Sequence, residues 1–230
     1  MAAGLGKRLG FLTASVPKPL LEVHGKPVLL HNIELCRKYG IDELFINTHY
    51  RADKVKDFFG DGKKFGVSIT YSYEPELLGT AGALNNFKAN LPDSPFFVIY
   101  ADNISDFNLR AIYDYHQREK AIATVALFEK RNVSLSGIAV LGEQGRIIQF
   151  IEKPAPEQEI SRLVNAGIYV LSPKIFEYIP FGFSDFGTDV FPRLISSGEG
   201  LYGVVMRGKL EAIDTIELYD EMRKNDEAQR

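Results

Sequence analysis

The first half of the chain alternates between short apolar runs and amphipathic segments, and this alternation constrains the fold more than any other feature. Runs typical of strands occupy residues 43–48, 68–73, 96–100 and 122–128. Segments with helical spacing lie between them, at residues 52–59, 80–90 and 109–119. The continuously apolar run FFVIY at 96–100 is typical of a strand buried on both faces of a parallel sheet. The alternation predicts an α/β fold with a Rossmann-like, doubly wound, mostly parallel sheet.

The pattern changes after residue 130. Strand-like segments at 137–141 and 146–151 flank Glu143-Gln144-Gly145, which predicts a hairpin. Further strands are expected at 164–171 and 201–207, and helices at 173–178, 189–196 and 215–228. We therefore expect one domain over residues 1–230, in which residues 131–230 add a smaller antiparallel layer to the parallel half at 1–130. This layer should cover the carboxyl ends of the parallel strands, where open α/β sheets bind ligands.

Composition excludes several classes of protein. The chain has 230 residues and a net charge of -3, which argues against a broad nucleic-acid interface. No run approaches the roughly 18 apolar residues of a membrane span, and no signal peptide is visible, so we expect a cytoplasmic protein without a membrane partner. The single cysteine, Cys36, supports neither a disulfide nor a cysteine-based metal site.

A glycine-rich segment near the start, AAGLGKRL at residues 2–9, is suited to binding phosphate. Its glycines permit a tight turn that brings backbone N–H groups against phosphate oxygens, and Arg8 can bind a phosphate through two parallel hydrogen bonds. Further along, Pro17 and Pro19 fix the backbone on either side of Lys18. A plain glycine-rich turn is the alternative. A dinucleotide-binding fingerprint fits poorly, because the third glycine is at residue 10 and two basic residues lie inside the loop.

The start of the chain is unusual for such a loop. A phosphate-binding loop normally follows a strand, and strands typically have ~5–6 residues. Here only Met1-Ala2-Ala3 precede Gly4. We therefore expect that the natural chain begins upstream of Met1 and that the first strand is truncated in this sequence.

Asp102 directly follows the apolar run at 96–100, within the motif Tyr100-Ala101-Asp102-Asn103. A carboxylate at the carboxyl end of a central strand is well placed to hold a metal ion. Mg²⁺ is the natural choice, because it takes one or two carboxylates and completes its coordination with phosphate oxygens and water. A capping aspartate is the alternative role.

Taken together, these motifs resemble those of the sugar-1-phosphate nucleotidylyltransferases. The opening match is AAGLGKRLGFLTASVPKPLL, and the motifs that follow in the family's order are EPELLGTAG at 74–82, YADN at 100–103, FIEKP at 150–154 and NAGIY at 165–169. The resemblance implies an enzyme that uses Mg²⁺ to join an NTP and a sugar 1-phosphate into an NDP-sugar and pyrophosphate. It also implies a nucleotide-binding half at 1–130 and a sugar-binding and closing half at 131–230, and is compatible with a homo-oligomer.

The resemblance also implies roles for individual residues. The expected phosphate contacts are Ala3, Gly4, Gly6, Arg8 and Lys18 for the NTP, and Lys153 for the sugar phosphate. The residues expected to face the sugar are Gly137, Glu152, Asn165 and Gly167. Asp102 is the expected first metal ligand. The variant ending Ala212-Ile213-Asp214-Thr215 makes Asp214 the expected second one, with a helix N-cap as its alternative role.

The segment at 74–82 is expected to bind the nucleotide base through Glu74, Gly79 and Thr80. It reads as a strand end, a turn and a helix N-terminus with free N–H groups. A carboxylate at Glu74 could accept from both donors on the guanine edge, which favours GTP and, by resemblance, mannose 1-phosphate. The alternatives are a uridylyl-, thymidylyl- or cytidylyltransferase of the same family and a non-catalytic regulatory subunit that binds sugar nucleotides. An NAD-dependent dehydrogenase is disfavoured by the loop.

Overall fold

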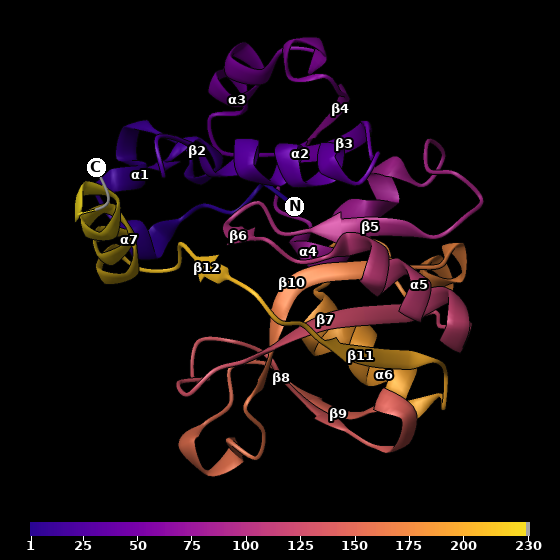
Figure 1. The fold of residues 1–230 in the computed structure, drawn as a ribbon. Coiled ribbons are helices and arrows are strands. Elements are labelled where there is room, and N and C mark those ends of the chain that lie inside the picture. Colours follow the sequence, from indigo (N-terminus) through magenta and orange to yellow (C-terminus); the bar gives the residue numbers. More distant parts are fainter. Residues whose placement is uncertain (229–230) are drawn as a thin grey trace. The chain divides into compact units, whose positions relative to one another are not determined.

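The computed structural model describes residues 1–228, and the chain divides into two compact units (Figure 1). Unit 1 contains Met1–Leu77, Tyr100–Asp106 and the chain from Lys209 onward. Unit 2 contains Leu78–Ile99 and Phe107–Gly208. Each unit is therefore assembled from segments on both sides of residue 130.

Unit 1 is built around a parallel strand pair. Strands β3 (Glu43–Thr48) and β4 (Ser68–Tyr73) pair in register from Glu43 opposite Ser68 to Thr48 opposite Tyr73. Helix α3 (Ala52–Phe59) connects them, as expected, and presents Val55 and Phe59 to a core that also contains Ile46 and Ile69. Helix α2 (Val28–Lys38), which contains Cys36, contributes Leu29 and Ile33 to the same core.

The remaining elements of unit 1 bring the two ends of its sequence together. Strands β6 (Asn103–Ser105) and β12 (Leu210–Ala212) pair antiparallel, and β12 leads to the last described helix, α7 (Ile216–Ala228). The short strands β1 (Glu22–Val23) and β2 (Lys26–Pro27) form a hairpin. A second core joins these elements, and its members are Leu9, Leu21, Val23, Val28, Ile104, Ile213, Tyr219 and Met222.

The first residues are hydrogen-bonded within unit 1. The carbonyl of Met1 accepts from the Ala101 N–H at 3.0 Å, and the Ala2 N–H donates to Asn47 Oδ1 at 2.7 Å. Met1 is thus hydrogen-bonded to the residues that follow β5, and Ala2 is hydrogen-bonded to strand β3. The expectation of further residues upstream concerns a part of the chain outside this sequence and stays a prediction.

Unit 2 is a mixed sheet with helices. Its strand order is β11 (Leu201–Val205), β7 (Ala123–Glu129), β10 (Leu163–Leu171), β8 (Ile138–Leu141) and β9 (Ile147–Ile151), and β5 (Phe96–Ile99) also pairs with β10. Strands β11 and β7 are parallel. The other pairings of this sheet are antiparallel. The α/β class is confirmed, but the sheet is mixed rather than mostly parallel.

Two expectations about elements of unit 2 need correction. The run at 96–100 does not form a parallel strand buried on both faces: β5 pairs antiparallel with β10, and its residues alternate between buried and partly buried. An apolar run specifies burial but not the direction of its partner. The expected helix at 80–90 is shorter and tighter, with one α-helical turn, α4 (Gly79–Gly82), followed by a 3₁₀ segment, Ala83–Phe87.

The rest of unit 2 largely follows the sequence pattern. Helix α5 (Leu109–Glu119) and the β8–β9 hairpin have the expected places. The expected helix at 189–196 is divided into a π-helical segment, Phe186–Val190, and α6 (Phe191–Ser196).

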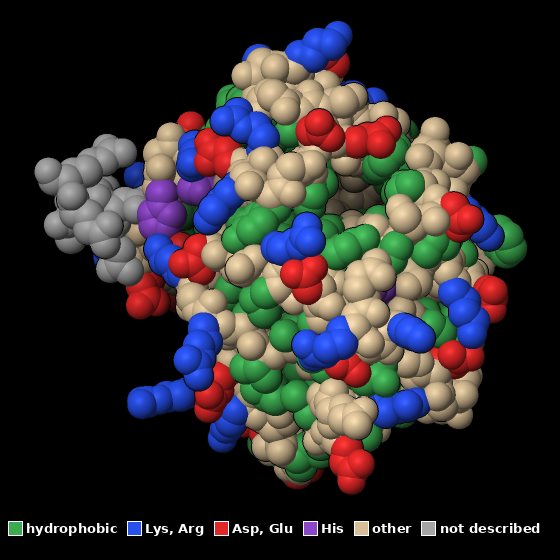
Figure 2. All heavy atoms as spheres, turned by 45° about the vertical axis from the view of Figure 1, so that its right-hand side comes forward, with side chains coloured by type: hydrophobic (Ala, Val, Ile, Leu, Met, Phe, Trp, Pro, Cys, Tyr) green, Lys and Arg blue, Asp and Glu red, His purple; other side chains and the backbone are tan. Residues whose placement is uncertain are grey.

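Two observations concern the surface of the described chain. None of the helices within residues 1–228 combines the length and apolar character needed to cross a bilayer. On the face drawn in Figure 2, acidic and basic side chains are intermixed.

Candidate active site

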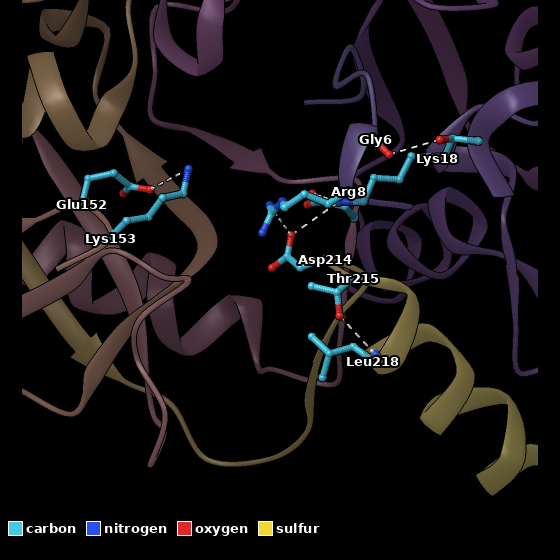
Figure 3. A network of polar contacts seen from close by, with 10 residues as sticks. Gly6, Arg8, Lys18, Glu152, Lys153, Asp214, Thr215 and Leu218 are labelled. Carbon is cyan, nitrogen blue, oxygen red and sulfur yellow. Dashed lines mark hydrogen bonds and ion pairs between the residues drawn. The ribbon is translucent and has the colours of Figure 1, made fainter. Parts of the chain in front are cut away.

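Four charged side chains from separate sequence motifs meet in unit 1, and we refer to Arg8, Lys18, Asp102 and Asp214 as the ionic cluster. Figure 3 labels three of them, Arg8, Lys18 and Asp214. Lys18 Nζ lies 2.6 Å from Asp102 Oδ2 and 3.5 Å from Asp214 Oδ1. Arg8 Nη2 donates to the same oxygen of Asp214 at 3.0 Å. The side chain of Lys18 is only 10% exposed, so its charge requires these partners, whereas Arg8 is 48% exposed and can reach a ligand from solvent.

The backbone of unit 1 explains why two aspartates 112 positions apart come together. Asp102 immediately precedes β6, and Asp214 follows β12 by two positions. Pairing of these strands sets Asn103 opposite Ala212, and the Ile213 N–H donates to the Asp102 carbonyl at 3.0 Å. The two carboxylates are therefore held at the same end of one strand pair.

The alternative role of Asp214 as a helix cap is not the one observed. Thr215 Oγ1 accepts from the Leu218 N–H at 3.4 Å, and the Thr215 carbonyl accepts from Tyr219 at 3.1 Å. Thr215 therefore caps the first turn of α7 (Figure 3). The carboxylate of Asp214 is oriented toward Arg8 and Lys18 instead.

Thr13, to which the sequence motifs assigned no role, is hydrogen-bonded to the glycine-rich loop. Thr13 Oγ1 lies 3.1 Å from the Gly6 carbonyl and 3.2 Å from the Gly10 carbonyl, so its hydroxyl can donate to either. Gly6 has a φ of +62°, and an added Cβ would lie 2.8 Å from Thr13 Cγ2. A side chain at Gly6 is therefore excluded by both conformation and space. At Gly4 an added Cβ would meet no heavy atom within 4 Å.

Glu74, the residue expected to bind the base, lies inside unit 1. Its side chain is 0% exposed, and Oε1 accepts from Asn47 Nδ2 at 2.7 Å. Asn47 is also the acceptor for the Ala2 N–H. The structure thus connects Glu74 to the beginning of the glycine-rich loop through one buried amide.

The turn at Gly79–Gly82, in unit 2, does not have the free N–H groups that we expected. The Thr80 N–H donates to Asp185 Oδ1 at 2.8 Å. The Ala81 and Gly82 N–H groups donate to the Ser184 carbonyl at 2.9 and 3.0 Å. That expectation is wrong, because a segment about 100 residues later in the chain supplies the acceptors. Thr80 Oγ1 also donates to Asp185 Oδ1 at 2.8 Å.

Gly79 is required for this packing. Its φ is +75°, and an added Cβ would lie 2.3 Å from the Ser184 carbonyl oxygen. Gly82 has helical backbone angles and is restricted by space alone, with an added Cβ 2.1 Å from the Gly182 carbonyl oxygen. Both glycines therefore allow two backbone segments of unit 2 to approach each other closely.

Glu152 of unit 2 lies between two glycines, and we call Gly137, Glu152 and Gly187 the Glu152 slot. A Cβ added at Gly137 or at Gly187 would lie 2.6 Å from Glu152 Oε2 in either case. Gly137 was expected near the sugar from its motif. Gly187, in the segment DFGTDVFP at 185–192, had no expected role.

Lys153, next to the slot, is the most exposed of the predicted site cations. Its side chain is 59% exposed, and Nζ lies 3.9 Å from Glu152 Oε1 (Figure 3). Its φ is +48°, an uncommon backbone conformation for a residue with a Cβ, and its N–H donates to the Ser136 carbonyl at 3.2 Å. Such conformations often mark functional positions.

Asn165 and Gly167 shape a bulge in β10. The pairing of β10 with β7 shifts register between Asn165 and Tyr169, and Gly167 has a φ of +70°. Asn165 Oδ1 accepts from the Gly167 N–H at 2.9 Å, and its Nδ2 donates to the Tyr169 hydroxyl at 2.7 Å. The asparagine therefore stabilises the irregular backbone of its own motif.

Comparisons with known proteins agree with the sequence motifs. The family model for nucleotidyl transferases matches residues 1–223. A UTP–glucose-1-phosphate uridylyltransferase from Synechocystis sp. is 36% identical over 220 residues, which cover 90% of this chain and 57% of that protein. Mannose-1-phosphate guanylyltransferase 1 from Arabidopsis thaliana is 34% identical over 213 residues, which cover 90% of this chain and 58% of that protein. This chain thus spans less than two thirds of the length of either relative.

Solved structures share the fold. A Bacillus anthracis protein assigned as a glucose-1-phosphate thymidylyltransferase, in complex with sucrose, has a TM-score of 0.87 and 26% identity, over 98% of this chain and 92% of that one. HddC from Yersinia pseudotuberculosis has a TM-score of 0.83 at 24% identity, over 97% and 96% of the two chains, and supports the fold alone. With the family match over residues 1–223, the resemblance drawn from the motifs is confirmed: the chain belongs to the nucleotidyl transferase family.

Proposed function

We propose that this chain transfers a nucleotidyl group from an NTP to a sugar 1-phosphate, forming an NDP-sugar and releasing pyrophosphate. The observation that carries the proposal is the ionic cluster, in which one buried ammonium contacts two carboxylates and a guanidinium lies against one of them. Two cations and two metal-binding carboxylates in one place suit a reaction between phosphate groups.

The donor set of the cluster fits Mg²⁺. Asp102 Oδ2 and Asp214 Oδ1 both lie within ion-pair distance of one nitrogen, so a single cation can contact both oxygens. Two carboxylates suffice for Mg²⁺, which takes its remaining ligands from phosphate oxygens and water. When bound, the ion would neutralise charge on the phosphates of the NTP.

The chemistry assigned to the residues of this chain is positioning and charge neutralisation. An anionic oxygen of the sugar phosphate attacks the α-phosphorus of the NTP, and the bond from that phosphorus to the pyrophosphate oxygen breaks. The attacking oxygen is already ionised, so no general base is needed. Arg8 and Lys18 neutralise the NTP phosphates, and Lys153 binds the sugar phosphate.

GTP with mannose 1-phosphate is the substrate pair that we favour. Several relatives, from Arabidopsis thaliana, Oryza sativa and Drosophila melanogaster, are mannose-1-phosphate guanylyltransferases that are 34–35% identical to this chain. UTP with glucose 1-phosphate is the second candidate, because the Synechocystis relative, a uridylyltransferase, is 36% identical.

The proposed setting is the cytoplasm, with small-molecule substrates and without nucleic-acid or membrane partners. The net charge of -3 and the intermixed charges on the face drawn in Figure 2 argue against a broad nucleic-acid interface. From the family resemblance we also propose that the protein self-associates into a homo-oligomer. Light scattering, which measures the molar mass in solution, would test this.

A panel assay of pyrophosphate release tests the proposal. Four NTPs are each combined with mannose, glucose and galactose 1-phosphates, with Mg²⁺ and with EDTA in its place. We expect release only where NTP, sugar 1-phosphate and Mg²⁺ are all present, with GTP and mannose 1-phosphate giving the highest kcat/KM. Nucleotide binding without pyrophosphate release in any combination would instead favour the non-catalytic regulatory subunit.

A further inference from the structure

A buried polar chain links the carboxyl ends of the two parallel strands of unit 1 to the start of the glycine-rich loop. Asn47 is the penultimate residue of β3, and Glu74 directly follows β4. Both side chains are in the interior, with 2% of Asn47 and none of Glu74 exposed. Polar groups buried this deeply are costly unless they are hydrogen-bonded, so their partners indicate what the two residues do.

The hydrogen bonds of Asn47 can run in only one direction. The Ala2 N–H can only donate, so its partner on Asn47 must be the amide oxygen, which leaves Nδ2 to face Glu74. Asn47 must therefore turn its Nδ2 toward Glu74 Oε1, at 2.7 Å, and its Oδ1 toward Ala2, at 2.7 Å. A side chain without both a donor and an acceptor, such as leucine, cannot make this connection. Glu74 thus accepts from the other end of the amide that holds Ala2.

Glu74 is itself fixed at its backbone. Its N–H donates to the Thr48 carbonyl at 2.8 Å, and His49 Nδ1 lies 2.7 Å from its carbonyl oxygen. These contacts anchor Glu74 to the residues that directly follow Asn47. The carboxylate is therefore held within the interior of unit 1, in contact with Asn47.

We infer that Asn47 and Glu74 are positioning residues for the phosphate-binding loop, and that Glu74 does not read the base. Ala2 directly precedes Ala3 and Gly4, whose backbone would contact the NTP phosphates, so the inference rests on the proposed function. Phosphates are common to every NTP. The pair consequently sets the affinity for all NTPs equally and leaves the choice of base to other residues.

Calorimetric binding of GTP and of UTP, each with Mg²⁺, separates the two roles of Glu74. Asn47→Ala removes the acceptor for Ala2 and should weaken both nucleotides by the same factor, about tenfold. Glu74→Gln retains an oxygen that can accept from Asn47, so both affinities should stay within about threefold of wild type. A change of about tenfold in the GTP/UTP affinity ratio of Glu74→Gln would overturn the inference and assign Glu74 to base recognition. Equal affinities in wild type and Asn47→Ala would also overturn it.

A double variant distinguishes loop positioning from loss of folding. Asn47→Leu combined with Glu74→Leu removes both buried polar partners, so no unpaired carboxylate remains, and the melting temperature should stay near that of wild type. Both nucleotides should nevertheless bind about tenfold more weakly, because Ala2 has lost its acceptor. Tight binding by the folded double variant would contradict the inference.

Hydrogen exchange at the Ala2 amide gives a readout that does not depend on nucleotide. The amide should be protected in wild type and in Glu74→Gln, and should exchange rapidly in Asn47→Ala. If wild type binds neither nucleotide, the proposed function fails, while this exchange pattern still tests the positioning of Ala2. Protection that persists in Asn47→Ala would show that Asn47 does not hold the loop.

Discussion

The ionic cluster of unit 1 and the Glu152 slot of unit 2 differ in how their charged groups are held. In the cluster, Lys18 is almost enclosed and lies within 3.5 Å of two carboxylates. Beside the slot, Lys153 is largely exposed and lies 3.9 Å from Glu152. The cluster is thus a preorganised arrangement of paired charges, whereas the slot is a carboxylate fitted between two glycines.

This difference predicts different consequences of mutation. Removal of one charge from a partly buried, mutually paired set leaves its partners uncompensated, which affects both chemistry and stability. Removal of an exposed charge changes ligand binding with little effect on the fold. In the slot, the sensitive property is space, because neither glycine position can accept even one methyl group without movement.

The largest effect is expected for Asp102→Asn, which removes a carboxylate that contacts Lys18 and would hold Mg²⁺. Turnover in the pyrophosphate-release assay should fall by about 10³-fold, while the protein remains folded by circular dichroism. Asp57→Asn, on an exposed position of α3, is the matched control and should retain wild-type turnover. A decrease of less than tenfold for Asp102→Asn would remove this carboxylate from the proposed metal site.

Lys18→Met and Lys153→Met compare the two regions directly. Lys18→Met should lower kcat/KM for the NTP by about 10²-fold and reduce the melting temperature, because Asp102 and Asp214 lose their shared cation. Lys153→Met should raise KM for the sugar phosphate by about tenfold without changing the melting temperature. Steady-state kinetics with each substrate varied in turn measures both effects. An increase in NTP KM for Lys153→Met equal to that for Lys18→Met would contradict the division of roles.

Gly187→Ala tests the slot through shape alone. The added methyl would meet Glu152 Oε2 at 2.6 Å, so the carboxylate must move, and KM for the sugar phosphate should rise by about tenfold. KM for the NTP should not change. Gly200→Ala is the control, since its added Cβ would make ordinary contacts from 3.4 Å outward. An unaltered sugar-phosphate KM would show that the position of Glu152 is not important for the sugar.

The smallest effect is expected for Thr13→Val, which removes the hydroxyl shared between the Gly6 and Gly10 carbonyls. One hydrogen bond is worth about 1 kcal/mol, so KM for the NTP should rise about two- to fivefold. Thr13→Ser keeps the hydroxyl and should restore the wild-type value. If Thr13→Val and Thr13→Ser have the same KM for the NTP, the Thr13 hydroxyl does not stabilise the loop for NTP binding.

The sequence motifs were sufficient to predict the α/β class and the family, and they named the four residues that the structure brings together in the ionic cluster. The pairings of distant segments were harder to predict. The Thr80 N–H donates to Asp185, and the next two N–H groups donate to the Ser184 carbonyl. The sequence around Thr80 does not indicate these acceptors, because the contact depends on packing within unit 2. The same limit applies to β5, whose apolar run indicates burial but does not define an antiparallel partner.

Some missed residues carried a signal that could have been used. Asn47 is a polar residue inside the apolar strand ELFINT, and a buried amide in such a place requires partners. Gly187 lies in a segment that no assigned role explained. Thr13 gave no comparable signal, because threonine is unremarkable in a short helix and its two acceptors depend on the fold of the glycine-rich loop.

The fate of the α-phosphorus tests the central claim most directly. The protein is incubated with Mg²⁺, a sugar 1-phosphate and NTP labelled with ³²P at either the α or the γ position, and the products are separated. The account predicts that the α label enters an NDP-sugar and the γ label enters pyrophosphate, in equal amounts. Recovery of the γ label as orthophosphate or as a phosphorylated sugar, with NDP as the other product, would contradict nucleotidylyl transfer.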